Sequence, residues 1–292
     1  MKRIIAFIIL ICMMLGGCTQ VTAPAQVAAT TLPVWEFTAR LCQGTGITVA
    51  RLVTENVSCL HDYTLQVSQM RQIESAELVV INGAGMEEFL EDALNDVAHV
   101  LDASTDIELH CGDEEADDRA HEHEHQHAED PHIWLSPILA IQMATNIYEG
   151  LCSRYPEHQQ IFQNNLTILI ADLQALQTYG ETTLSTLSHR ELITFHDGFT
   201  YFAESFGLTI LESVEEESGS EASAAELIRL IRIVQDSQLP AIFTETNGSA
   251  SAAAIIAAET GINKYILDMV MAGDSYFDAM YRNINTIKEA LG

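Results

Sequence analysis

One stretch decides the fold, residues 157–187, EHQQIFQNNLTILIADLQALQTYGETTLSTL. Its apolar residues recur near the 3.6-residue period of an α-helix along the whole stretch, and Gly180 is its only weak helix former. A helix of this length is longer than most helices in globular proteins. We therefore predict one long helix, placed as a connector between the two halves of the chain.

Both flanking halves alternate short apolar strands with helices. Before the connector, the pattern predicts strands at 47–53, 77–81 and 97–101 and helices at 32–41, 64–75, 86–94 and 137–153. After it, the pattern predicts strands at 191–195, 208–212, 241–245 and 264–268 and helices at 198–206, 224–235, 249–260 and 276–291. Such alternation favours parallel sheets. The predicted fold class is α/β, with one lobe at 30–156, a second at 188–292, and a parallel-type sheet flanked by helices in each.

The N-terminus has the pattern of a lipoprotein signal. Lys2 and Arg3 precede an apolar run that is too short to span a bilayer comfortably, and the run ends in Leu-Gly-Gly-Cys at 15–18. This ending resembles a bacterial lipobox, which implies a signal peptide at 1–17 and lipid on Cys18; the alternative is an ordinary secreted protein with an incidental cysteine. Residues 18–29 are small and polar and indicate a tether. We expect a body outside the cytoplasmic membrane, because no later segment reads as a transmembrane helix.

Charge excludes some classes of partner. The 292 residues carry 42 acidic and 13 basic side chains, a formal charge of −29, so the surface repels nucleic acid and attracts cations. Residues 102–130 form an acidic, solvated loop. Four histidines alternate along it with acidic residues and a glutamine: His121, His123, His125 and His127. In an extended chain they would share one face and could chelate a metal weakly; alternatively, the loop is solvated and holds no metal.

Cysteine usage leaves two possibilities open. Beyond Cys18, the chain has Cys42, Cys59, Cys111 and Cys152, an even number in an oxidising compartment. We predict disulfides Cys42–Cys59 and Cys111–Cys152, because each closes a short segment within one half of the chain. The alternative is that these residues are buried thiols. Their spacing does not match a site with four thiolates on one metal.

Four titratable residues suit a metal site between the lobes. His61, His196 and Asp268 follow predicted strands, at the end where α/β sheets bind ligands. His132 lies between Pro131 and Pro137, which restrict its backbone. Each lobe contributes two of the four side chains. Three imidazoles and one carboxylate complete a tetrahedral zinc site, whereas manganese prefers more oxygen ligands.

Several motifs resemble the solute-binding lipoproteins of zinc- or manganese-uptake ABC transporters. The matching segments span about 30–292 and read HDYTLQVSQMRQIESAELVVINGAGMEEFL (61–90), DPHIWLSP (130–137), ITFHDGFTYFAESFGL (193–208), AIFTE (241–245), AAETGINKYILD (257–268) and SYFDAMYRNINTIKEAL (275–291). The resemblance implies metal ligands at His61, His132, His196 and Asp268, a long connecting helix and limited lobe movement. Members specific for zinc often carry a histidine-rich loop, which favours zinc here.

The chain departs from the family pattern in two places. Thr64 and Leu65 stand where the family usually has Pro or Glu-Pro after the His-Asp-Tyr. Residues 269–271, Met-Val-Met, stand where Pro-Leu-Gly commonly follows the final aspartate. The second departure makes Asp268 the weakest member of the predicted ligand set.

The expected function is a receptor and not an enzyme. It would capture zinc outside the membrane and deliver the ion to a cognate ABC permease, and we expect a monomer. A manganese receptor of the same family is the first alternative. A zinc hydrolase is the second: if Asp268 is not a ligand, a coordination position would be open for water, and Glu245 could act as the base, although the chain has no His-Glu-x-x-His.

Overall fold

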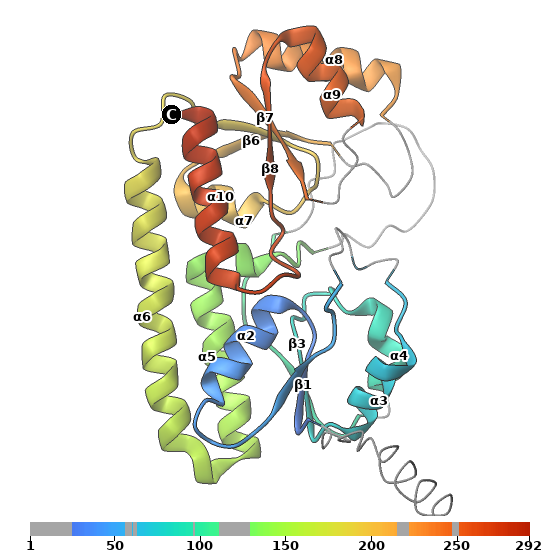
Figure 1. Ribbon diagram of the computed structural model, residues 1–292, viewed down its shortest axis with the longest axis vertical. Helices are drawn as coiled ribbons and strands as arrows, with labels where there is room; N and C mark the ends of the chain where they lie inside the picture. The colour runs from blue at the N-terminus through green and yellow to red at the C-terminus, as the bar shows by residue number, and fades with distance from the viewer. Residues whose placement is uncertain are drawn as a thin grey trace, which may run out of the picture.

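The computed structural model describes residues 25–55, 60, 63–95, 97–110, 129–214, 222–246 and 251–292. Several predictions therefore lie outside the described residues: the signal peptide at 1–17, Cys18, His61, Cys59, Cys111, and the histidines at 121, 123, 125 and 127. Two α/β lobes stand one above the other in Figure 1, and one long helix runs beside both of them. The predicted fold class is confirmed.

The N-terminal lobe contains a four-stranded parallel sheet in the order β2-β1-β3-β4. Its strands are β1 (Val27–Ala29), β2 (Val49–Arg51), β3 (Leu78–Ile81) and β4 (Val100–Asp102). The helices of this lobe are α2 (Leu32–Leu41), α3 (Val67–Ser75), η1 (Glu88–Leu90), α4 (Glu91–Leu94), η2 (Ile133–Leu135) and α5 (Pro137–Arg154). The expected helix at 86–94 is therefore two short helices in succession.

The expected tether at 18–29 is wrong at its C-terminal end. Its last three residues form β1, an inner strand of the sheet, and all three are fully buried. An inner strand of a parallel sheet is covered on both faces and needs no alternation of polar and apolar side chains. The short sequence Val-Ala-Ala therefore gave no periodic signal. The N-terminal lobe begins before residue 30.

The C-terminal lobe repeats the topology of the first, with parallel strands in the order β6-β5-β7-β8. Its strands are β5 (Glu191–Thr194), β6 (Thr209–Ser213), β7 (Ala241–Glu245) and β8 (Asn263–Leu267). Its helices are α7 (Thr200–Phe206), α8 (Ala224–Asp236), α9 (Ser251–Thr260) and α10 (Tyr276–Leu291). Each predicted element of this half is present, with ends shifted by one or two residues.

The connector is α6 (Gln159–Leu184), 26 residues long, preceded by the 3₁₀ turn η3 (Pro156–His158). It is shorter than the predicted 157–187 at both ends, because residues 156–158 form the 3₁₀ turn and the α-helix ends at Leu184. Gly180 does not interrupt the helix; it is a position where α6 approaches α7 closely. A Cβ there would lie 2.2 Å from the ring of Phe206 in α7. The glycine lets the long helix pack directly against the C-terminal lobe.

The lobes share one hydrophobic core. The segment after β8 crosses to the N-terminal lobe, where the Trp134 indole N–H donates to the Met269 carbonyl at 2.8 Å. The Tyr276 hydroxyl donates to the Trp134 carbonyl at 2.8 Å, and its ring packs edge-on against Phe37 of α2. All four side chains are buried in one cluster that draws on both lobes. Because packed cores resist deformation, this joint restricts large lobe movement.

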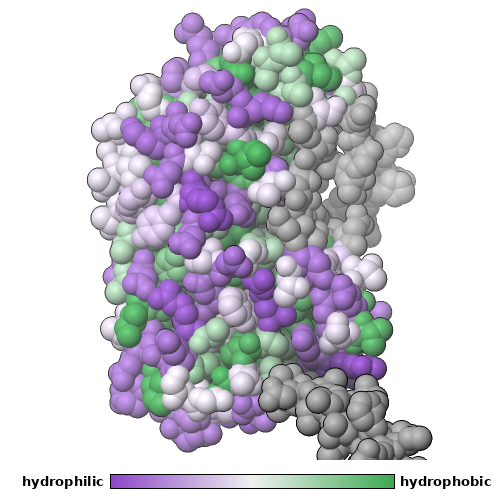
Figure 2. Space-filling model, in the orientation of Figure 1, coloured by the Kyte–Doolittle hydropathy of each residue, from purple (hydrophilic) through white to green (hydrophobic). Residues whose placement is uncertain are grey.

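The outer surface is predominantly polar. Figure 2 shows hydrophilic residues spread over both lobes on one face, with hydrophobic residues in small separate groups. Among the residues the model describes, no helix is both long enough and apolar enough to cross a membrane.

Cys42 and Cys152 are free thiols in the structure, and their predicted disulfide partners, Cys59 and Cys111, lie outside the described residues. Cys42 is 3% exposed at the end of α2, and burial raises the pKa of its thiol to about 12. Cys152 lies in α5, partly buried, and burial also raises the pKa of its thiol. The alternative of buried thiols therefore describes these two residues, because packing against apolar neighbours disfavours the reactive thiolate.

We predict that both thiols react with a maleimide without prior reduction. Cys152 should be labelled in the native protein, because it is partly exposed. Cys42 should be labelled only after unfolding, because it is buried. Peptide mass spectrometry of native and guanidinium-treated protein measures this, with a sample reduced beforehand as the control. Labelling of either residue only after reduction would show that it forms a disulfide.

Candidate metal centre

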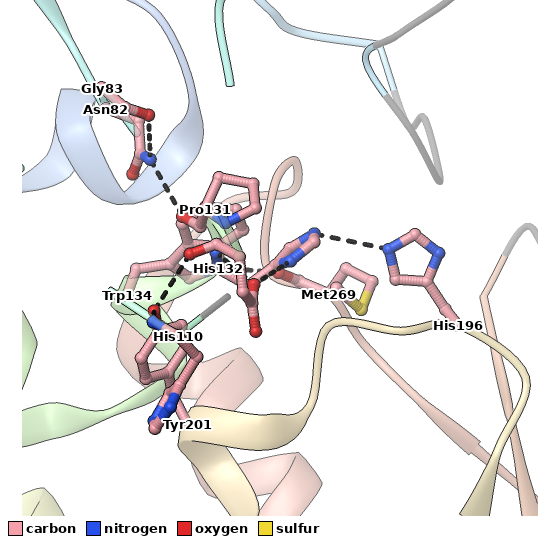
Figure 3. Close-up of polar contacts among 10 residues, drawn as sticks. Asn82, Gly83, His110, Pro131, His132, Trp134, His196, Tyr201 and Met269 are labelled. Atoms are coloured by element: carbon pink, nitrogen blue, oxygen red, sulfur yellow. Dashed lines mark hydrogen bonds and ion pairs between the residues drawn. The ribbon is translucent and has the colours of Figure 1, made fainter. Parts of the chain in front are cut away.

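His132 is held in one orientation by Asp130. The Asp130 carboxylate oxygen Oδ1 accepts the His132 backbone N–H at 2.9 Å and lies 2.7 Å from its Nδ1 (Figure 3). An ionised carboxylate only accepts hydrogen bonds, so Nδ1 carries the proton and Nε2 has a free lone pair. The imidazole is largely buried, with 9% of its side chain exposed. A carboxylate behind a histidine in this way is the usual support for a metal ligand.

His196 has a carboxylate on the same side of its ring in the other lobe, at a longer distance. It follows β5, and its Nδ1 lies 3.6 Å from Oε1 of Glu245, the buried last residue of β7. Adjacent parallel strands end at the same edge of a sheet, which explains why these two residues meet. The Glu245 carboxylate thus lies on the Nδ1 side of the His196 ring, and Nε2 is on the opposite side.

The two Nε2 atoms face each other at 3.3 Å, with the rings nearly perpendicular at 89° (Figure 3). Two lone pairs at this distance repel unless a proton or a cation lies between them. Zinc binds imidazole nitrogen at about 2.0–2.1 Å with tetrahedral angles, which places two ligand nitrogens about 3.3–3.4 Å apart. The observed spacing is therefore that of two nitrogens on one tetrahedral zinc.

Gly198 makes room for the His132 ring at the turn between β5 and α7. A Cβ on Gly198 would lie 2.9 Å from Cε1 and Nδ1 of His132 and 2.7 Å from the Met269 methyl carbon. Real Cβ atoms essentially do not approach other atoms so closely, so a larger residue would displace the imidazole. The glycine of His-Asp-Gly thus has a steric role beside the metal position.

Asp268 follows β8, as expected, but its carboxylate has other partners. Its Oδ1 accepts the Val270 N–H at 2.7 Å, and its Oδ2 lies 3.3 Å from a guanidinium nitrogen of Arg282. Val270 has φ 62°, a left-handed conformation that a β-branched residue rarely adopts. Within the described ranges, no three His, Cys, Asp or Glu side chains gather as a metal-holding group. The structure thus brings together the rings of His132 and His196, and metal ligation by His61, His132, His196 and Asp268 stays a prediction.

The sequence interpretation missed two supports of this site. Asp130 was available in the Asp-Pro-His motif, because an aspartate two residues before a ligand can reach the imidazole. The second support is Glu87, a buried carboxylate that accepts hydrogen bonds from Thr30 Oγ1 and from the Asn82 and Gly83 N–H groups. Burial raises its pKa to about 7. The Asn82 side chain donates in turn to the Pro131 carbonyl at 3.0 Å, which fixes the chain beside His132 (Figure 3).

Residues 27–290 match the model of a family described as zinc-uptake complex component A, periplasmic. The chain belongs to this family. It is 29% identical to the high-affinity zinc uptake system protein ZnuA of Bacillus subtilis, over 91% of this chain and 87% of that protein. It is 28% identical to the zinc-binding lipoprotein AdcA of Streptococcus pneumoniae over 99% of this chain, which spans only 61% of that protein's length. The resemblance seen in the sequence is confirmed.

Solved structures agree with the family assignment. A crystal structure of ZnuA superposes with a TM-score of 0.78 at 28% identity and covers 92% of this chain and 100% of that one. The Zn(II)-bound ZnuA-like domain of Streptococcus pneumoniae AdcA superposes with a TM-score of 0.76 at 25% identity, over 92% and 99% of the two chains. The fold of the family, two parallel sheets joined by a long helix, is therefore the fold of this chain.

We predict that Gly198→Ala weakens zinc binding by about 10–100-fold. The added methyl would displace the His132 ring from the Asp130 carboxylate, and loss of such a supporting group typically costs this much affinity. Competition with a chromogenic zinc chelator measures the affinity. Gly150→Ala is the matched control: its Cβ would lie 1.6 Å from a methyl of Leu101, away from the histidines, so it should lower stability and leave affinity unchanged. Equal affinity for the parent and Gly198→Ala would show that the glycine has no role at the site.

Proposed function

We propose that this chain is the extracytoplasmic zinc receptor of an ABC metal-uptake transporter. It captures zinc outside the membrane and delivers the ion to a membrane permease. The observation that carries this proposal is the 3.3 Å spacing of the His132 and His196 Nε2 atoms, one from each lobe. Similarity to ZnuA and AdcA, whose names specify zinc, supports the same cargo.

Zinc fits the described donors better than manganese does. The nitrogens that converge are imidazole nitrogens, which zinc favours, whereas manganese favours carboxylate and water oxygens. The nearby carboxylates are engaged elsewhere: those of Asp130 and Glu245 face the Nδ1 side of the two rings, and that of Asp268 faces Arg282. His61 is the proposed third ligand, and Asp268 completes the set if it leaves Arg282.

The hydrolase alternative loses its proposed base. Glu245 lies on the Nδ1 side of His196, opposite the nitrogen that would hold the metal, so it supports the ligand and does not face a metal-bound water. The family is that of an uptake-complex component, a solute-binding receptor. The metal is cargo, and the protein is not an enzyme.

Two further features complete the proposal. Cys18 would carry the lipid anchor that holds the receptor at the cell membrane, in line with the lipoprotein name of the AdcA relative. The loop histidines His121, His123, His125 and His127 would capture zinc at low affinity before it reaches the site. The receptor would act as a monomer and would bind no nucleic acid, because its charge is −29.

Calorimetric titration of metal-free protein tests the site. We predict one tight zinc-binding event that weakens by more than about 100-fold in His132→Ala, because losing a ligand costs more than losing the group behind it. The event should persist when residues 113–128 are deleted. Tighter manganese than zinc binding would reassign the cargo. Tight binding that survives His132→Ala but disappears with the deletion would place the site in the loop.

Zinc affinity should fall as the pH drops from about 7.5 to about 5, because a protonated imidazole cannot ligate. The variant lacking 113–128 isolates the primary site in this measurement. Chelator competition at several pH values gives the affinity, and circular dichroism at each pH checks that the protein stays folded. An affinity that is constant across this range would contradict a histidine site.

A further inference from the structure

Tyr201 joins two stretches of the N-terminal lobe to helix α7 of the other lobe. Its hydroxyl accepts the His110 backbone N–H at 2.9 Å and donates to the Asp130 carbonyl at 3.0 Å (Figure 3). The Asp130 N–H donates to the His110 carbonyl at 2.8 Å and closes a ring of three hydrogen bonds. The Tyr201 side chain is almost fully buried, with 2% of the residue exposed, so water does not compete for these bonds.

The surroundings keep the hydroxyl in its neutral, donating form. Burial raises the pKa of Tyr201 to about 12, and the nearby carboxylates of Asp130, Glu204 and Glu129 act in the same direction. The His110 ring packs on the Tyr201 ring with centroids 4.8 Å apart, and its Nε2 lies 2.8 Å from Oε2 of Glu204. Glu204 is also in α7, so the helix holds His110 by both its backbone and its ring.

The bond from Tyr201 leads directly to a metal ligand. Asp130, whose carbonyl accepts this bond, uses its carboxylate to hold both the backbone N–H and the Nδ1 of His132. A second contact from α7 supports the same segment: the Ser205 hydroxyl lies 2.8 Å from that of Ser136, the residue that caps α5. One face of α7 thus orients residues 130–136 of the opposite lobe.

We propose that Tyr201 is a positioning residue for the metal site, which acts on His132 through Asp130. This inference rests on the proposed zinc-receptor function and names a residue that sets the ligand geometry. The turn from β5 to α7 carries His196, and α7 carries Tyr201, so one continuous segment of the C-terminal lobe fixes both imidazoles. The Nε2 spacing then depends on this segment and not only on how the two lobes are packed.

Tyr201→Phe tests the proposal, because it removes the hydroxyl and keeps the ring. Zinc affinity should fall by about 10-fold, the lower end of the effect of groups that support a ligand. The matched control is Tyr155→Phe. Tyr155 lies at the corner between α5 and α6 and is also buried, with 5% of the residue exposed. Its hydroxyl donates to the Glu77 carboxylate. The control should alter stability and leave zinc affinity within about 2-fold of the parent. Equal affinity for Tyr201→Phe and the parent would overturn the proposal.

A double-mutant cycle tests the route through Asp130. In an Asp130→Ala background the carboxylate behind His132 is gone, so Tyr201→Phe should cost less than about 2-fold in zinc affinity. An undiminished 10-fold loss in that background would overturn action through Asp130. Cobalt(II) provides a second readout, since a displaced His132 should change the visible spectrum of cobalt-loaded Tyr201→Phe but not that of Tyr155→Phe.

Imidazole nitrogen NMR of the metal-free protein separates this inference from the proposed function. In the parent, His132 should show a protonated, hydrogen-bonded Nδ1, and Tyr201→Phe should weaken that bond or mix the two tautomers. An unchanged His132 signal in Tyr201→Phe would overturn the inference whatever the metal affinity. Absence of zinc binding by the parent would instead refute the proposed receptor function, and it would leave the effect of Tyr201 on the His132 tautomer measurable.

Discussion

The structure depends on one contact, between two imidazole nitrogens that come from different lobes and lie 3.3 Å apart. Asp130 lies 2.7 Å from Nδ1 of one ring and Glu245 lies 3.6 Å from Nδ1 of the other, and the two Nε2 atoms face the same small space. Such an arrangement is unfavourable without a proton or cation between the nitrogens. Two nitrogens that already face each other need not be ordered when a cation binds. This preorganisation raises the affinity for a cation of the right size.

The remainder of the fold keeps these two rings in place. The lobes share a hydrophobic core around Trp134 and Tyr276, and α6 passes beside both lobes. The left-handed Val270 lies in the segment that crosses between the lobes, where the buried surroundings hold a conformation that the residue alone would avoid. Release of cargo by the proposed receptor therefore requires movement within a packed joint. This favours small displacements near the ligands over a wide opening of the lobes.

The sequence was sufficient for the fold class and for choosing two histidines that meet, because both depend on local patterns. The period of the connector, the alternation of strands and helices, and histidines at strand ends are all visible in the sequence, and the structure places His132 and His196 together. Strand β1 could not be predicted, since three small apolar residues show no period. The free state of Cys42 and Cys152 could not be predicted either, because a free buried thiol and a bonded one have the same spacing along the chain.

The supports of the site were less visible than its ligands. Asp130 is two residues from His132 in the sequence, where it could equally be a solvated loop residue. Its contacts with the His132 N–H and Nδ1, seen only in the structure, identify it as a supporting group. Tyr201 reaches Asp130, and Glu245 reaches His196, through tertiary contacts with no sequence spacing to indicate them. Glu245 was expected as a base under one alternative, and it lies instead 3.6 Å from Nδ1 of His196, on the side of the ring opposite Nε2.

The most direct test of this account is the zinc K-edge X-ray absorption spectrum of the protein lacking residues 113–128, loaded with one equivalent of zinc. The account predicts nitrogen and oxygen neighbours at about 2.0–2.1 Å, together with the outer-shell scattering of at least two imidazoles. A spectrum with no imidazole scattering, or with sulfur at about 2.3 Å, would contradict it.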